Sequence, residues 1–121
     1  MKPTIYIAGP MRGRPDFNRP AFNAAAERLA ARGWHPINPV DIEKIYPCVE
    51  EDGEVNSLNI TDLLAIEREF AKRADAIYLL DGWETSEGAR GELRTFLEYG
   101  GSDVFLGLDG TPDSRKQEGE S

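Results

Sequence analysis

The sequence has few of the residues that build metal and redox sites. Its 121 residues include one cysteine, Cys48, and one histidine, His35. A single cysteine excludes an internal disulfide bond, and the two residues together are too few for a zinc site of the Cys/His type. We therefore expect one domain held together by an apolar core, without a metal ion.

Long hydrophobic runs are absent as well. No apolar run approaches the roughly 20 residues of a membrane span, and the apolar part of the N-terminal "MKPTIYIAGP" is too short for a signal peptide. The net charge is −8, although residues 1–40 carry six Lys/Arg against two Asp/Glu. We expect a soluble, cytoplasmic protein with no membrane or polymeric nucleic-acid partner, in which a small anion could bind near the N-terminus.

Strand and helix patterns alternate along the chain. Short β-branched and aromatic runs predict strands, and apolar residues at helical spacing predict helices, with Leu63, Ile66 and Phe70 facing the core. The predicted strands are 4–8, 34–38, 75–80 and 103–108, and the predicted helices are about 19–32, from Ile60 or Thr61 to 72, and 87–99. This alternation predicts a three-layer α/β sandwich with a small parallel sheet.

Two segments lack a periodic pattern. Residues 41–60 carry many charges together with Pro47 and Gly53, and we interpret them as a long excursion of the kind that is usually functional. Residues 109–121 contain no core residue and are expected to form a disordered tail after a domain of residues 1–108. We expect Asn18 to cap the helix that begins at about residue 19.

The first strand is followed by "GPMRGR", which matches neither the Walker nor the dinucleotide phosphate-binding pattern. Gly9 would allow close backbone approach, and Arg12 is suited to bidentate binding of a phosphate. Ligands bind at the carboxyl ends of strands in open α/β sheets, where this loop lies. The alternative is a plain turn with a solvated arginine.

The stretch "DGWETSEGARGEL" follows the third strand. Ser86 or Thr85 can cap the next helix, and two glycines in its first turns, Gly88 and Gly91, suggest close approach to the backbone. Glu92 would be held ionised by the helix dipole, which suits a nucleophile or a charge stabiliser. The alternative is a solvated helix glutamate.

Further carboxylates and aromatic residues fall near the same edge of the sheet. Glu67 precedes the third strand and Asp81 ends it. A carboxylate opposite Glu92 would resemble the pair that cleaves glycosidic bonds through an oxocarbenium-like transition state. Trp83 and Tyr6 could stack on a base or sugar, although such residues are more often core or rim aromatics.

Two motifs together resemble the nucleoside 2-deoxyribosyltransferase-like superfamily. They are "YIAGPMRG", which runs from strand one into the loop after it, and "ADAIYLLDGWETSEGARGE", which surrounds strand three. The resemblance is closest to its DUF4406 family and covers residues from about 4 to 106. It implies a flavodoxin-like or Rossmann-like fold, no metal or cofactor, and a homodimer or higher homo-oligomer. It also implies cleavage of the N-glycosidic bond of a (deoxy)nucleoside or its 5′-monophosphate, by hydrolysis or by deoxyribosyl transfer.

The resemblance assigns roles residue by residue. Glu92 becomes the nucleophile, Tyr6 orients its carboxylate, and Glu67 stands where the family usually has the aspartate that serves the base. That departure leaves Asp62 open as an alternative acid. The expected substrate-binding residues are Gly9, Pro10, Met11, Arg12, Gly13, Asn18, Asp81, Trp83, Ser86 and Gly88.

Three other readings share the fold class. A phosphorylation receiver would need paired acids after strand one, and a flavodoxin would need a Ser/Thr-rich loop there. The chain has Gly9-Pro10 and Met11-Arg12 at these places. A non-catalytic nucleotide-binding module on the same fold is the alternative that survives, because a shared fold does not fix activity.

Overall fold

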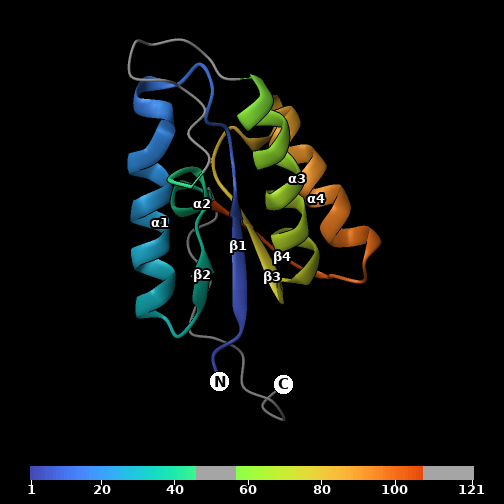
Figure 1. The fold of residues 1–121 in the computed structure, drawn as a ribbon. Coiled ribbons are helices and arrows are strands. Elements are labelled where there is room, and N and C mark those ends of the chain that lie inside the picture. The colour runs from blue at the N-terminus through green and yellow to red at the C-terminus, as the bar shows by residue number, and fades with distance from the viewer. Residues whose placement is uncertain (46–56, 108–121) are drawn as a thin grey trace.

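The structure is a computed structural model that describes residues 1–45 and 57–107, with the backbone alone for 57–60 (Figure 1). Strands and helices alternate, except that two helices, α2 and α3, follow β2. In chain order they are β1 (Thr4–Ala8), α1 (Arg19–Ala31), β2 (His35–Ile37), α2 (Pro39–Glu43), α3 (Ser57–Arg73), β3 (Ala76–Leu79), α4 (Glu87–Glu98) and β4 (Asp103–Leu106), with 3-10 turns at Pro15–Asn18 and Trp83–Thr85.

The four strands form one parallel sheet in the order β2-β1-β3-β4. Tyr6 of β1 pairs with Ile37 on one side and with Ile77 on the other. β3 is buried along its whole length, as expected of a strand that is covered on both faces. The predicted parallel sheet is confirmed.

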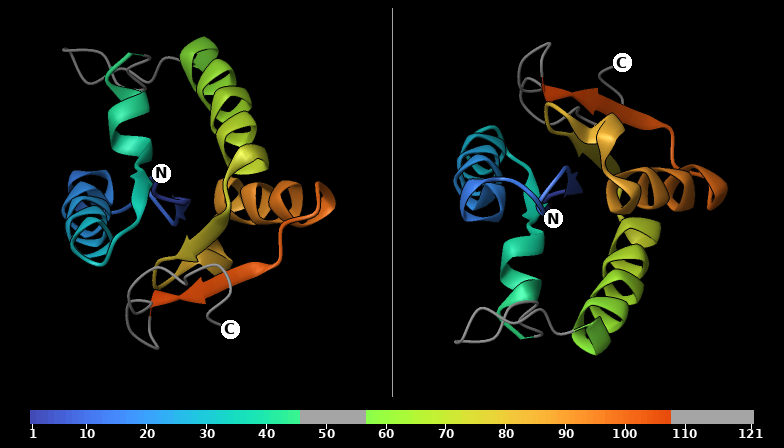
Figure 2. Two further views of the ribbon diagram at one scale, coloured as in Figure 1. Left: turned by 90° about the horizontal axis from the view of Figure 1, so that it is seen from below. Right: turned by 90° about the horizontal axis from the view of Figure 1, so that it is seen from above.

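Helices cover both faces of the sheet (Figure 2). Alternate side chains of β1 point to opposite faces, so that Ile5 and Ile7 pack in one core with Phe22 and other side chains of α1. Tyr6 and Ala8 pack in a second core with residues of α3 and α4. The predicted three-layer α/β sandwich is confirmed.

The predicted boundaries differ from the structure in the middle of the chain. α3 begins at Ser57, three or four residues before the predicted start, because no glycine or proline interrupts the chain there. The short helix α2 lies partly within the predicted excursion 41–60. The rest of that excursion falls largely on residues 46–56, which lie outside the described residues, as does the predicted tail 109–121.

The core-facing side of α3 also differs from the prediction. Phe70 is 42 % exposed, and the buried residues within 61–73 of the helix are Leu63, Glu67 and Ala71. These three lie four residues apart on one helical face. An acidic side chain therefore occupies the core stripe where sequence patterning favoured apolar residues.

The expected cap of α1 is wrong. Asn18 precedes the helix with φ of 60°, and its side chain makes no capping hydrogen bond. It donates instead from Nδ2 to the carbonyl of Pro10 at 2.9 Å. Asp16 and Phe17 also have positive φ, 52° each, so that three successive residues adopt the left-handed region that non-glycine residues rarely occupy.

None of the helices in the described ranges is long and apolar enough to cross a membrane.

Candidate functional site

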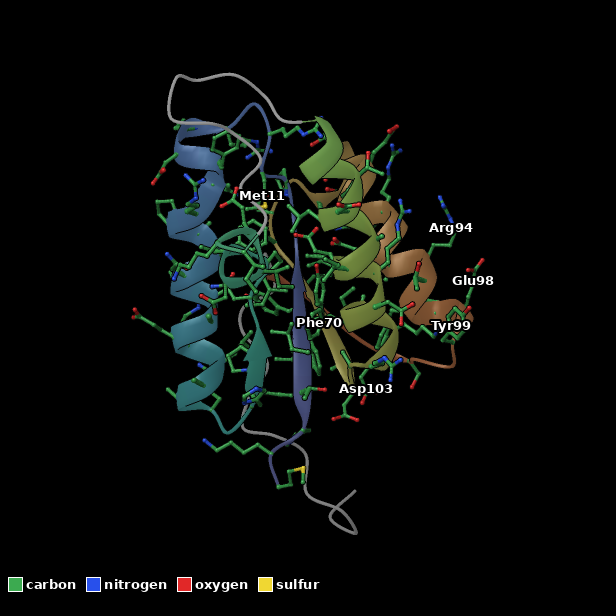
Figure 3. The ribbon with its side chains drawn as sticks, viewed as in Figure 1. Met11, Phe70, Arg94, Glu98, Tyr99 and Asp103 are labelled. Atoms are coloured by element: carbon green, nitrogen blue, oxygen red, sulfur yellow. The ribbon has the colours of Figure 1, made fainter. Side chains whose placement is uncertain are left out.

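A cavity of about 380 Å³ opens beside the loop that follows β1. It lies where chain segments from both layers of helices meet, and Met11 marks this end of the molecule in Figure 3. The lining residues are Gly9, Pro10, Met11, Arg12, Arg14, Phe17, Phe22, Pro39, Glu43, Leu63, Leu64, Glu67, Thr85, Ser86, Glu87, Gly88, Ala89 and Glu92.

Glu92 lines this cavity, and Tyr6 holds its carboxyl group through a hydrogen bond. The phenol of Tyr6 is fully buried and donates a hydrogen bond of 3.0 Å to Glu92 Oε2. Tyr6 sits in the central strand and Glu92 in the second turn of α4, so the sheet and the helix fix the two groups independently. Tyr6 itself is not among the lining residues, and the expectation that it stacks on a ligand gains no support.

Glu67 stands next to Glu92. The two side chains share a hydrogen bond, which requires a proton on one of them. Both residues are 4 % exposed. Glu67 Oε2 is buried without a hydrogen-bond partner among the described residues. The wall of the cavity thus contains a carboxyl pair with an unused acceptor.

Burial sets the proton affinity of this pair. It raises the pKa of Glu67 to about 7, and the charge of Glu43 contributes in the same direction. The pKa of Glu92 lies well above its usual range because of burial first and the neighbouring Glu67 second, although Tyr6 and Arg68 act in the opposite direction. The pair therefore shares one proton at neutral pH, as close carboxyl pairs do.

This result corrects the expectation that the helix dipole keeps Glu92 ionised. The carboxyl group is removed from water, and another carboxyl group lies against it, so the direction of the pKa shift is the reverse of that expected. Burial likewise raises the pKa of Tyr6 well above its ordinary value. Tyr6 therefore remains a hydrogen-bond donor at physiological pH.

A third buried carboxylate, Glu43, lies at the end of α2. It is 6 % exposed and pairs with Arg19 of α1, whose Nε donates to Glu43 Oε1 at 3.0 Å. Glu43 was missed by the sequence analysis. The signal that could have found it is Asn38-Pro39, a helix cap followed by a first-turn proline, because the cap places Glu43 on a short helix after β2.

Two arginines and the N-terminal end of α4 lie at the mouth of the cavity. Arg12 and Arg14 line it from the loop after β1. Ser86 caps α4 by accepting from the Ala89 amide at 3.1 Å, which confirms one of the two predicted caps. Gly88 lies beside it in the first turn, so this helix end offers backbone donors to an anion.

Two of the conspicuous glycines have a packing reason. A Cβ on Gly9 would lie 2.8 Å from Leu80 Cβ, so the end of β1 can pass β3 only without a side chain. A Cβ on Gly91 would lie 3.0 Å from the guanidinium of Arg68. The close approach that the Gly88/Gly91 pattern suggested is therefore, at Gly91, the approach of α3 rather than of a ligand.

The structure brings together most of the predicted site residues but not all of them. Glu92, Glu67, Ser86 and the loop residues Gly9 to Arg12, together with Gly88, line the cavity. The predicted residues that do not line it are Tyr6, Gly13, Asn18, Asp81 and Trp83, and the alternative acid Asp62 does not line it either.

Three of the predicted residues that do not line the cavity lie on the surface or at the edge of the core. Asp62 and Asp81 are exposed, and Trp83 packs at the edge of the core shared by the sheet, α3 and α4. Of the two acids considered for the base, Glu67 is therefore the one in the cavity. The described residues contain no group of three or more His, Cys, Asp or Glu side chains that could hold a metal ion.

Comparison with known proteins identifies the family of the chain. A search of the curated proteins found none. Among protein-family models, the family described as "Domain of unknown function (DUF4406)" matches residues 3–101. This match spans most of the 121 residues, and the chain therefore belongs to the DUF4406 family.

Proposed function

We propose that the protein cleaves the N-glycosidic bond of a nucleoside or nucleoside 5′-monophosphate, with Glu92 as the nucleophile. The observation that carries this proposal is the buried Glu67–Glu92 pair, braced by Tyr6, in the wall of a cavity whose mouth carries Arg12. The resemblance to nucleoside 2-deoxyribosyltransferase-like enzymes supports the same assignment, and we propose membership of that superfamily.

In the first step, a carboxylate oxygen of Glu92 attacks the anomeric carbon of the sugar. The bond between this carbon and the base nitrogen breaks, and its electron pair leaves with the base. Glu67 donates the shared proton to the departing base, so a neutral base and a glycosyl ester on Glu92 are formed. Tyr6 supports this step because its hydrogen bond favours the ionised form of Glu92.

In the second step, water attacks the same carbon and the ester bond to Glu92 breaks. Glu67, now ionised, accepts the proton of the water, which restores the shared proton of the pair. If a second base enters in place of water, its ring nitrogen receives the sugar and the outcome is transfer. The two reactions share the intermediate, and both remain within the proposal.

The cavity suits a nucleotide in size and charge. Its volume of about 380 Å³ falls within the usual range of about 300–1,000 Å³ for small-molecule sites. Arg12 and Arg14, with the first amides of α4, provide donors for a phosphate at the mouth. We therefore favour a 5′-phosphorylated substrate.

One observation favours a non-catalytic nucleotide-binding module as the second candidate. Burial and Glu67 raise the pKa of Glu92, so Glu92 becomes a nucleophile only when the shared proton resides on Glu67. A chain that had lost turnover could keep such a protonated pair as a hydrogen-bond donor to a sugar hydroxyl.

The test is to incubate the protein with deoxynucleosides and their 5′-monophosphates and to measure free base by chromatography. Glu92→Gln keeps the size of the side chain and removes the nucleophile, and we expect the rate to fall at least about 1,000-fold. Glu98→Gln is the matched control, because Glu98 lies exposed at the far end of α4 (Figure 3). It should release base at the wild-type rate.

The outcomes separate the candidates. Base release that persists in Glu92→Gln would refute the nucleophile assignment. Binding of nucleotides without base release by the wild-type protein would establish the binding module instead. Addition of a second free base separates transfer from hydrolysis, and Arg12→Ala should weaken binding of monophosphates more than that of nucleosides.

The resemblance also implies self-association, and we propose a homo-oligomer on that ground. Sedimentation equilibrium over a range of protein concentrations measures the mass directly. A monomer at all concentrations would refute this part of the proposal without affecting the site.

A further inference from the structure

Glu43 occupies a place in the cavity that the proposed reaction leaves unused. It lines the same space as Glu67 and Glu92, but it comes from α2, the short helix that follows β2. An ionised group is stable away from water only when it is paired or hydrogen-bonded, and the pair with Arg19 uses one of the two oxygens of Glu43. The position of Glu43 therefore calls for a specific account.

The sheet order separates the cavity into two ends. β2 and β3 lie on opposite sides of β1. The segment after β3 contributes Ser86 and Gly88 to the lining, whereas the segment after β2 contributes Pro39 and Glu43. A ligand whose phosphate binds at Ser86 and whose anomeric carbon lies at Glu92 would thus extend its remaining part, the base, toward Glu43.

The surroundings of Glu43 suit a flat base. Phe22, Pro39 and Leu63 supply apolar surface to the lining, which a base can contact with its faces. Polar recognition is then confined to the edge of the base. Glu43 is the carboxylate that the segment after β2 contributes to the lining.

Arg19 determines which oxygen of Glu43 is engaged within the protein. The guanidinium donates from Nε to Oε1, and its Nη2 lies 3.0 Å from the same oxygen. Oε2 receives no hydrogen bond from the described residues, although the side chain is only 8 % exposed. Oε2 is thus the oxygen of Glu43 that is left for a ligand in the cavity.

We propose that Glu43 is a specificity-determining residue whose free oxygen accepts a hydrogen bond from an exocyclic amino group of the base. This inference rests on the proposed function for the placement of the sugar, and it names the substrate class as amino-bearing nucleotides. A base with a carbonyl group at the same place would bring an acceptor against the carboxylate. Such a base leaves its own carbonyl oxygen and Glu43 Oε2 without a donor, and the site therefore rejects it.

The experiment compares matched nucleotides that differ in that one group. Deoxycytidine and deoxyuridine 5′-monophosphates form one pair, and the deoxyadenosine and deoxyinosine 5′-monophosphates form the other. For the wild-type protein, we expect kcat/KM for at least one amino-bearing member to exceed that of its partner about tenfold or more. For Glu43→Gln, whose amide can donate to a carbonyl, we expect the ratio to fall to about one or to invert.

Exposed Glu27 of α1 provides the control, because Glu27→Gln makes the same chemical change outside the cavity. It should retain the wild-type ratio. Calorimetric binding of the same four nucleotides to Glu92→Gln gives a second readout that needs no turnover. Here too the amino-bearing member of a pair should bind about tenfold more tightly or better.

Each result bears on one proposal separately. Amino-selective binding that Glu43→Gln abolishes, without base release by the wild-type protein, would support the role of Glu43 and refute the proposed reaction. Base release at equal rates within both pairs, unchanged in Glu43→Gln, would refute the role of Glu43 and leave the reaction intact. Should Glu43→Gln fail to fold, equal wild-type ratios in both assays would still refute the inference.

Discussion

The shared proton of Glu67 and Glu92 makes the stability of the protein depend on pH. In the unfolded chain Glu67 has its ordinary pKa of 4.5, whereas burial raises its pKa to about 7 in the folded protein. Between these values the folded state binds a proton that the unfolded state has lost. Stability is therefore complete below about pH 4.5 and falls as the pH rises toward 7.

The magnitude follows from the width of this interval. Each pH unit within it is worth about 1.4 kcal/mol, so the full interval corresponds to about 3 kcal/mol. About 2–3 kcal/mol of this loss should occur between pH 5 and pH 8. Glu92 adds to this loss, because its pKa is raised well above the usual range and it keeps a proton that the unfolded chain has lost, so the figure for Glu67 is a lower bound.

The double variant Glu67→Gln/Glu92→Gln removes both titrating groups and keeps the shape of the side chains. Urea unfolding at pH 5, 6, 7 and 8 gives the free energy of unfolding of the variant and the wild-type protein. We expect the variant to gain at least about 2–3 kcal/mol relative to the wild type across this range. In exposed Glu98→Gln the difference from wild type should stay constant within about 0.5 kcal/mol.

A constant difference between the double variant and the wild type would refute the reasoning. The test survives if that variant does not fold, because carboxyl ¹³C resonances of the wild-type protein report the same titration. One glutamate should then titrate near pH 7. Titration of every observed carboxyl group near its ordinary value would contradict the raised pKa of Glu67.

Three further predictions concern single substitutions. In Gly9→Ala the new Cβ would lie 2.8 Å from Leu80 Cβ, and we expect the free energy of unfolding to fall by about 1–3 kcal/mol in urea titrations; an unchanged value would contradict the packing. Tyr6→Phe removes the hydrogen-bond donor to Glu92, and kcat should fall about 10- to 100-fold; an unaltered kcat would argue against a role of this hydrogen bond in the reaction. In Glu43→Gln the limb of the pH–rate profile that reports Glu67 should move to lower pH, because the charge of Glu43 raises the pKa of Glu67; a limb that stays in place would exclude that influence.

The layers of the fold could be predicted because their signals are local. A β-branched run such as residues 4–8 and the helical spacing of Phe22, Ala25 and Leu29 do not depend on distant contacts. The convergence of Arg12, Ser86 and Glu92 was predictable for a related reason. Parallel strands end at the same edge of a sheet, so segments that follow them are brought together whatever their separation in sequence.

The electrostatics of the site could not be predicted in this way. From the sequence, the visible influence on Glu92 is its own helix, whose dipole favours the ionised form. The larger influences are burial and a carboxyl group from α3, which lies 25 residues earlier in the chain at Glu67. Whether two helices pack side by side is decided by tertiary contacts, such as that of Arg68 on Gly91, which no local pattern contains.

Glu43 and the turn before α1 escaped prediction for a different reason. α2 has five residues, too few to establish a helical period, and its apolar residues are followed by a charged segment. The positive φ angle of Phe17 contradicts the preference of an aromatic residue, and it stands between Asp16 and Asn18 with the same backbone conformation. Such conformations persist only where surrounding contacts impose them.

Those contacts converge on one side chain. Arg19 pairs with Asp16 at 2.9 Å, lies 5.0 Å from the centre of the Phe17 ring, and holds Glu43 in the cavity wall. A change at position 19 would therefore release the turn and leave a buried carboxylate unpaired at the same time. Positions 16, 19 and 43 should accordingly vary together among relatives, and a member that lacks the arginine should also lack the acid at position 43.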